Sequence, residues 1–286
     1  MRDRRRQARS GTLRGVWGTR RATVADHAAI RRLFAELGVP DPPPDAVELE
    51  RHMLPRVLVA CGDGPDDVVG YACWRIYDDV AHVVNVVTAP SARSRGVGRA
   101  LMDATRRTVI DEGCRRWYLN VKRDNAPARR LYARCGMATE RDLWLLAARW
   151  LQLDALAAEP SAVAASAYTP GPDDEAVIAD RFGLPRARLA SLHARPGVVA
   201  AALRDGGATV AYAAFDRRLP GALVLCAERA GLVRPLLEAW RPHAAPSGTD
   251  VIRIVVDGER ALVQALVDAG AEVTFELVQM GGPLVG

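Results

Sequence analysis

The chain has 286 residues, 49% of them hydrophobic, and a formal net charge of +5. This length suits two compact domains, each with room for a hydrophobic core. The sequence shows no uncharged apolar stretch of membrane-spanning length and no secretory signal, so we expect a cytoplasmic protein with no membrane partner.

The positive charge gathers in the first nine residues, which hold five arginines and one aspartate and so contribute +4. The rest of the chain is close to neutral, which argues against a nucleic-acid partner. We expect residues 1–16 to form a disordered basic tail. Such a tail either contacts an acidic partner or nucleic acid, or is a solvated extension.

Cysteine and histidine spacing gives no sign of a metal site. The five cysteines form no C-x-x-C pair, and the five histidines form no H-E-x-x-H motif. We therefore expect reduced thiols, as in a cytosolic protein, and no bound metal.

The first part of the chain mixes short apolar runs with amphipathic stretches. Its residues predict a strand at 17–24, helices at 28–37 and 45–54, and strands at 57–61, 68–77 and 80–88. Asp26 can cap the first helix, and Gly38 with the prolines at 40–44 ends it.

The stretch from Val80 to Gly136 carries the clearest chemical signal. The strand at 80–88 runs into a loop with Arg93, Gly96 and Gly98, and the loop opens a helix expected at 97–112. Unpaired N–H groups at a helix start bind phosphate, glycines allow close approach, and arginines add charge. The alternative is an ordinary strand-to-helix turn. The loop matches neither a dinucleotide fingerprint nor a Walker loop, which leaves the pattern Arg-x-x-Gly-x-Gly.

A second helix signal follows a strand at 117–121. Asn125 is a good N-cap, Pro127 suits the first turn, and Gly136 suits the residue after the helix. The residues that fall on one face at helical spacing are Ala128, Leu131, Tyr132 and Cys135.

The two signals, in this order and at this separation, resemble the GNAT superfamily of acetyl-CoA-dependent N-acetyltransferases. Arg93-x-x-Gly96-x-Gly98 is similar to the family's pyrophosphate-binding loop, and Asn125-x-x-Ala128-x-x-Leu131-Tyr132-x-x-x-Gly136 is similar to its next motif. The resemblance covers residues 17–150 and fades beyond them. It implies an α/β (α+β) fold of two GNAT-like domains, each a mixed, mainly antiparallel sheet flanked by helices.

The resemblance also implies acetyl-CoA as co-substrate and a set of coenzyme-binding residues. Backbone amides of the central strand would hold the pantetheine arm, and the loop and the next helix would bind the rest. The residues implied are Val86, Val87 and Thr88 on the strand, Arg93, Ser94, Arg95, Gly96, Val97, Gly98 and Arg99 in the loop, and Asn125 and Ala128 at the helix.

Transfer of an acetyl group to an amine needs a proton for the departing thiolate and a base for the amine. Tyr132 lies where the family's general acid lies; otherwise it is a core aromatic. The strand lacks the glutamate that many GNAT proteins use as base, but His82 faces the same side as Val84 and has a suitable charge change near neutral pH. His82 can equally be a polar residue at a strand start, and Glu140, Asp78 or Asp79 acting through water stay open.

The rest of the chain repeats this order after a linker expected at 152–172. The elements expected are helices at 174–182 and 185–192, strands at 197–203, 208–215, 222–226 and 251–256, a helix at 259–269 and a strand at 272–280. The region between 137 and 151 is expected to form a closing pair of strands.

The repeat has an offset of about 134 residues, because Gly136 corresponds to Gly270. The loop becomes Glu228-x-x-Gly231-x-Val233, and the position of Tyr132 becomes Leu266. An acidic Glu228 disfavours a pyrophosphate. We therefore expect a catalytic domain at 17–151 and a degenerate GNAT-like domain at 173–286.

The function expected from these features is acetyl transfer from acetyl-CoA to a primary amine of a small molecule. The alternatives are a protein or peptide N-acetyltransferase and a non-catalytic acetyl-CoA-binding sensor or scaffold. A monomer and a homodimer are both compatible with the sequence.

Overall fold

The computed structural model describes residues 17–39, 42–64, 66–156, 166–217, 221–244, 248 and 250–284. The expected basic tail at 1–16 lies outside these ranges. The chain forms two compact units. The first contains residues up to 75 together with 83–112, and the second contains 76–82 together with 113–286.

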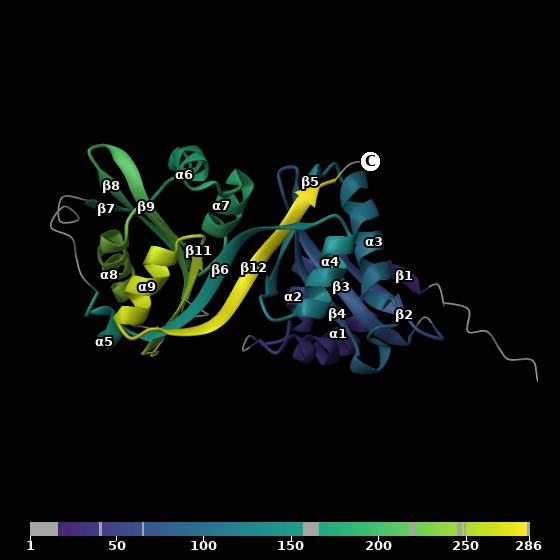
Figure 1. Ribbon diagram of the computed structural model, residues 1–286. Coiled ribbons are helices and arrows are strands. Elements are labelled where there is room, and N and C mark those ends of the chain that lie inside the picture. Colours follow the sequence, from purple (N-terminus) through teal and green to yellow (C-terminus); the bar gives the residue numbers. More distant parts are fainter. Residues whose placement is uncertain are drawn as a thin grey trace, which may run out of the picture. The chain divides into compact units, whose positions relative to one another are not determined.

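The first unit is a sheet in the strand order β1–β2–β3–β4, with β2 antiparallel to both β1 and β3 (Figure 1). Its strands are β1 (Gly18–Arg21), β2 (Val57–Cys61), β3 (Val68–Tyr77) and β4 (Val80–Thr88). Its helices are α1 (His27–Phe34), α2 (Ala46–Glu48) and α3 (Val97–Asp111). The ends of β3 and β4 that meet at their connecting turn belong to the second unit.

Helices cover both faces of this sheet, which explains why β2 is apolar and buried throughout. Ile30 and Leu33 of α1 pack in one cluster with Val59 of β2. The residue that follows Val59 in β2 points to the other face and pairs with Gly70 of β3. Leu101 of α3 lies next to Gly70. The alternation of side chains along a strand therefore puts α1 and α3 on opposite faces.

The second unit is a longer sheet in the order β5–β12–β6–β11–β10–β9–β8–β7. Its strands are β5 (Arg116–Lys122), β6 (Ala138–Arg149), β7 (Ser166–Tyr168), β8 (Val198–Asp205), β9 (Ala208–Asp216), β10 (Gly221–Ala227), β11 (Val251–Asp257) and β12 (Glu272–Pro283). Its helices are α4 (Ala126–Arg134), α5 (Trp150–Leu153), α6 (Asp174–Phe182), α7 (Arg186–His193), α8 (Val233–Ala244) and α9 (Arg260–Asp268). The start of β4 runs parallel to β5, and β10 runs parallel to β11, whereas the remaining pairs are antiparallel.

Two long strands, β6 and β12, pair with each other, and each of them also pairs with one further strand. They pair with each other in antiparallel register. The last seven residues of β12 also pair with β5, and the last seven residues of β6 also pair with β11. The last strand of the chain, yellow in Figure 1, therefore lies between β5 and β6.

The segment β11–α9–β12 repeats the segment β5–α4–β6. Its three elements begin 134 or 135 positions after their counterparts. Gly136 and Gly270 follow the two helices at equivalent places, and both have positive φ, 85° and 99°. This geometry confirms the repeat offset that the sequence indicates, and glycine is the residue that adopts such a φ without strain.

The expected closing strand pair between 137 and 151 was wrong: Ala138–Arg149 form one strand, β6, and Trp150 begins helix α5. The central charged residues of this strand have partners on neighbouring segments. Arg141 pairs with Asp257, and Asp142 pairs with Arg123. Charged residues are therefore compatible with an unbroken strand at this place.

Besides α5, two further elements were not expected. Helix α8 buries Val233, Leu236, Leu237 and Trp240 at helical spacing, and its Pro235 lies in the first turn, where no N–H partner is needed. Strand β7 lies inside the expected linker, of which residues 157–165 fall outside the described ranges. The expected fold class, a mixed and mainly antiparallel α/β arrangement flanked by helices, is confirmed. The domain boundaries at 151 and 173 stay a prediction.

Candidate active site

The loop between β4 and α3 has the backbone geometry of an anion site. Ser94 and Gly96 both have positive φ, 60° and 92°, and Gly96 is the N-cap of α3. Because this N-cap is a glycine, it has no side chain to cover the first N–H groups of the helix. The residues from Arg93 to Gly96 are exposed. The first turn of α3 thus presents N–H groups and the positive end of a 15-residue helix toward the exposed loop.

Gly70 of β3 lies beneath this loop and leaves no room for a side chain. A Cβ atom at Gly70 would lie 2.7 Å from the carbonyl oxygen of Val87 and 3.0 Å from Cγ1 of Val97. The glycine therefore lets β4 and the start of α3 pack directly onto β3. Gly70 was not predicted as part of this region, although a glycine inside a strand pattern is a known sign of close backbone approach.

Each arginine of the loop has a partner. Arg93 donates from Nη2 to Glu36 Oε2 at 2.7 Å and from Nε to the carbonyl oxygen of Thr88 at 3.3 Å. Arg99 donates to Asp103 at 2.8 Å, one helical turn further on. All of these side chains are well exposed, so each ion pair contributes little to stability.

Trp17 braces the loop from the start of the first unit. Its indole Nε1–H donates to the carbonyl oxygen of Arg95 at 2.7 Å, and the Arg95 guanidinium lies 5.2 Å from the centre of the indole ring. Trp17 and Glu36, which contact the loop from other segments, were also not predicted from the sequence. Glu36 gave a weak signal, because a carboxylate near a helix C-terminus is unfavourable unless it has another partner.

Asn125 is the N-cap of α4, as expected. Its Oδ1 accepts a hydrogen bond from the backbone N–H of Ala128 at 3.2 Å. This contact satisfies one of the N–H groups at the helix start and joins two of the residues that the resemblance assigned to the coenzyme.

Tyr132 lies on the same helix and is 7% exposed. Burial, with a smaller effect from Cys135, raises the pKa of its phenol to about 12. The side chain therefore stays protonated at neutral pH, which is the state that a general acid needs.

His82 lies on β4 where this strand pairs with β5. Its ring is half-buried and stacks on Tyr118, with centroids 4.5 Å apart and planes 4° from parallel. Tyr118 is buried, and burial raises the pKa of its phenol. The imidazole is thus held in one plane by a neutral ring.

The three carboxylates that were alternatives to His82 all have structural contacts. Asp78, with a positive φ of 56°, accepts from the backbone N–H of Ala187 in the first turn of α7. Asp79 accepts from Nε of Arg115 at 2.8 Å. Glu140 pairs with Arg116 and also accepts from Nε2 of Gln279 at 2.9 Å.

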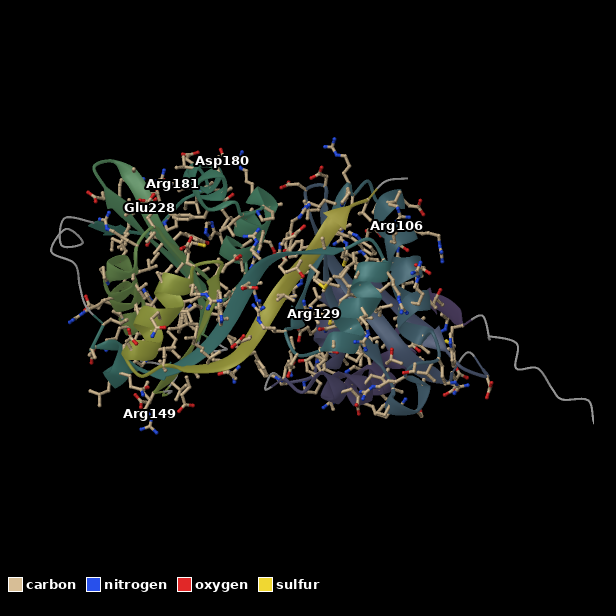
Figure 2. The ribbon with its side chains drawn as sticks, viewed as in Figure 1. Arg106, Arg129, Arg149, Asp180, Arg181 and Glu228 are labelled. Carbon is tan, nitrogen blue, oxygen red and sulfur yellow. The ribbon has the colours of Figure 1, made fainter. Side chains whose placement is uncertain are left out.

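The counterpart of the loop in the second unit has a different surface. Glu228 pairs with Arg181 of α6, as Figure 2 shows, and Gly231, Leu232 and Val233 are buried. The exposed glycine turn before α3 therefore has a buried counterpart before α8. Burial removes the N–H groups of this turn from contact with a ligand in solvent.

The described residues contain no group of three His, Cys, Asp or Glu side chains that could hold a metal ion. The five cysteines are free thiols. Within the described ranges, no helix is long and apolar enough to cross a membrane.

Residues 26–137 match the model of the Acetyltransferase (GNAT) family. This segment holds β4, the glycine loop, α3 and α4.

Among curated proteins, the chain is similar to two mycothiol acetyltransferases. One, from Cellulomonas flavigena, is 31% identical over 114 residues, which are 40% of this chain and 33% of that protein. The other, from Corynebacterium jeikeium, is 33% identical over 103 residues, covering 30% of each. The chain thus spans about a third of the length of the curated relatives that it matches.

Solved structures extend the likeness in fold to nearly the whole chain. A GCN5-related N-acetyltransferase from Sphaerobacter thermophilus has a TM-score of 0.67 at 19% identity and covers 96% of this chain and 98% of its own. A tandem GNAT protein from the clavulanic acid biosynthesis pathway has a TM-score of 0.59 at 19% identity, with 92% and 95% covered.

Proposed function

We propose that this protein is an acetyl-CoA-dependent N-acetyltransferase that acts on a primary amine of a small molecule. The observation that carries the proposal is the exposed turn capped by Gly96 at the start of α3, inside a segment that matches the GNAT family. Support for an acyl-transfer reaction comes from the acetyltransferase relatives. The small-molecule amine is our own inference.

The coenzyme would lie along β4 and the loop. The N–H groups from Val97 to Arg99 suit the pyrophosphate, and Arg93, Ser94 and Arg95 lie on the same exposed turn. Val86, Val87 and Thr88 would hold the pantetheine arm through their backbone. In support, β4 pairs in parallel with β5 at Val80–His82, which precede these residues.

Acetyl-CoA supplies an acetyl group activated as a thioester. His82 takes the proton that the amine loses as it attacks, and backbone N–H groups of β4 stabilise the oxyanion. Tyr132 gives its phenolic proton to the departing sulfur. The raised pKa of Tyr132 means that the phenol is protonated at neutral pH before the transfer.

We further propose that residues 17–151 form the catalytic domain and residues 173–286 a GNAT-like domain that binds no coenzyme. The buried turn at Gly231 and the carboxylate of Glu228 support the second part. The free cysteines are in keeping with a cytoplasmic location, which we include in the proposal together with a monomer or homodimer.

Calorimetric titration of the full chain with acetyl-CoA and CoA tests this proposal. We expect one site per chain, and we expect Gly98→Glu to abolish binding because a carboxylate in the first turn repels phosphate. Glu228→Gln serves as the control and should leave binding unchanged. The melting temperature of each variant shows that it is folded.

Each of the other results of the titration would contradict one part of the proposal. Two sites per chain would mean that the second domain binds coenzyme, and no binding would remove the acetyltransferase proposal. A screen against free amines and against peptides then identifies the acceptor. Acetylated peptides alone would favour a protein acetyltransferase, and tight binding without any product would favour a sensor.

A further inference from the structure

Arg93 forms an ion pair with a carboxylate on the short helical turn that follows α1. Glu36 belongs to the short 3₁₀ turn that continues α1, and its Oε2 lies 2.7 Å from Nη2 of Arg93. The end of α1 is thereby tied to the loop that precedes α3. This tie uses one of the arginines that the proposed pyrophosphate site offers.

The second unit contains the same tie with the charges reversed. Arg181 of α6 pairs with Glu228 in the loop that precedes α8 (Figure 2). Arg181 and Glu36 each stand two residues before a left-handed glycine that ends the helix, Gly183 and Gly38.

The loop partners correspond as well. Arg93 stands three residues before Gly96, and Glu228 stands three residues before Gly231. Both pairs therefore join the end of the first helix to the same point of the following loop. Because the charges are reversed in the second unit, such a tie forms with the arginine on either side. The tie alone therefore does not explain why the loop of the first unit carries the arginine, and we assign this arginine a second role.

We propose that Glu36 is a latch for Arg93, which passes from the Glu36 carboxylate to the coenzyme pyrophosphate when the coenzyme binds. The exchange releases the end of α1 at the moment when the site fills. Glu36 is a positioning residue here, because it acts through Arg93. This inference rests on the proposed function, since it needs a coenzyme at the loop.

The strength of the latch sets the size of the effect. The side chains of Arg93 and Glu36 are 53% and 34% exposed, so solvent screens their attraction. In the wild-type protein, coenzyme binding must first break this ion pair. Coenzyme affinity should therefore be about two- to fivefold lower than in a variant that lacks the pair. The latch therefore adjusts affinity rather than preventing binding.

The test is a double-mutant cycle on the full chain, with CoA as the titrated ligand. The variants are Glu36→Gln, Arg93→Gln and the double variant, measured by calorimetry at low salt. We expect Glu36→Gln to raise CoA affinity by about two- to fivefold, and Arg93→Gln to lower it. In the double variant, the gain from Glu36→Gln should disappear.

The reversed pair provides matched controls. Arg181→Gln and Glu228→Gln break an equivalent tie in the second unit and should leave CoA affinity unchanged. A Glu36→Gln enzyme saturated with coenzyme should keep its wild-type kcat, because the latch is already open there. A merely structural role for Glu36 would instead change kcat and affinity together.

Two results would overturn the latch. One is an unchanged or lower CoA affinity in Glu36→Gln. The other is a gain that persists in the Arg93→Gln background, which would mean a general effect of removing a negative charge. If the wild-type protein binds no CoA, the proposed function fails and the latch fails with it. If the wild-type protein binds CoA and Glu36→Gln has no effect on affinity, only the latch is removed.

Discussion

His82 and Tyr118 lie face to face across the parallel pairing of β4 with β5, with ring planes 4° from parallel. The ring nitrogens of an imidazole lie in the plane of the ring, so a stacked partner leaves their hydrogen-bonding directions clear of the stacking face. Tyr118 therefore orients His82 without using the nitrogen that a base needs.

Replacing His82 by glutamine should lower kcat by about 10²-fold or more, because the attacking amine loses its base. CoA affinity should stay near wild type, because His82 is assigned to the chemical step. Tyr118→Phe keeps the stack and is the matched control. A kcat within about twofold of wild type in His82→Gln would return the base to Glu140, Asp78 or Asp79.

Tyr132→Phe should lower kcat by about 10²-fold while it leaves CoA affinity and the melting temperature nearly unchanged. The reason is that phenylalanine keeps the buried ring and removes the proton. Because the pKa of Tyr132 is raised to about 12, the wild-type enzyme should show no alkaline loss of kcat from this group at pH 9 or 10. A variant with wild-type turnover would show that Tyr132 is a core aromatic.

Gly70→Ala should destabilise the protein by about 1–3 kcal/mol, because the added methyl group overlaps the carbonyl oxygen of Val87. CoA affinity should fall as well, since β4 or the start of α3 must move. Urea unfolding and calorimetry measure the two effects. Gly18→Ala on the edge strand β1 is the control, where a Cβ meets nothing within 4 Å and stability should be equal or slightly higher. Equal stability of the two variants would show that β4 adjusts freely.

Asp26 should make the protein sensitive to acid. It is 5% exposed and accepts two hydrogen bonds from the Arg20 guanidinium, at 2.7 and 2.8 Å, and one from the N–H of Thr23. The hydrogen bonds from Arg20 hold the pKa of Asp26 below its ordinary value of 3.8. Its stabilisation is therefore present above pH 3.8 and lost as the pH falls further.

Asp26→Asn should cost on the order of 2 kcal/mol at pH 7 and should flatten the decline of stability below pH 4. Urea unfolding between roughly pH 2.5 and pH 7, a range that includes the titration of Asp26, measures both effects. Asp103→Asn, which breaks an exposed pair one turn apart, should cost only a few tenths of a kcal/mol. A parallel pH dependence in wild type and Asp26→Asn would exclude Asp26 as the acid-sensitive group.

The parts of the site that are local in sequence could be predicted from it. The run from β4 through Gly96 into α3 follows from an apolar strand, a glycine turn and a helix start, and Asn125 caps α4 as its position implies. Each of these features depends on residues within one turn of each other. Backbone geometry of that kind is set mainly by the local residues.

The contacts that join distant segments could not be predicted. Nothing near Arg93 indicates Glu36, 57 positions earlier, and nothing near Gly96 indicates Trp17. The charged residues in the middle of β6 likewise have their partners, Asp257 and Arg123, on other segments. Pairings of this kind depend on the register of the whole sheet, which a single sequence does not contain.

The position of β12 constrains how the gene can change. A nonsense mutation just before Glu272 would spare every residue of the coenzyme loop, together with His82 and Tyr132, yet it would take the strand from between β5 and β6. Strand β5 leads directly into α4, which carries Tyr132, so the damage would reach the chemistry. The second repeat therefore supplies a strand that β5 and β6 need, whether or not its own loop binds a ligand.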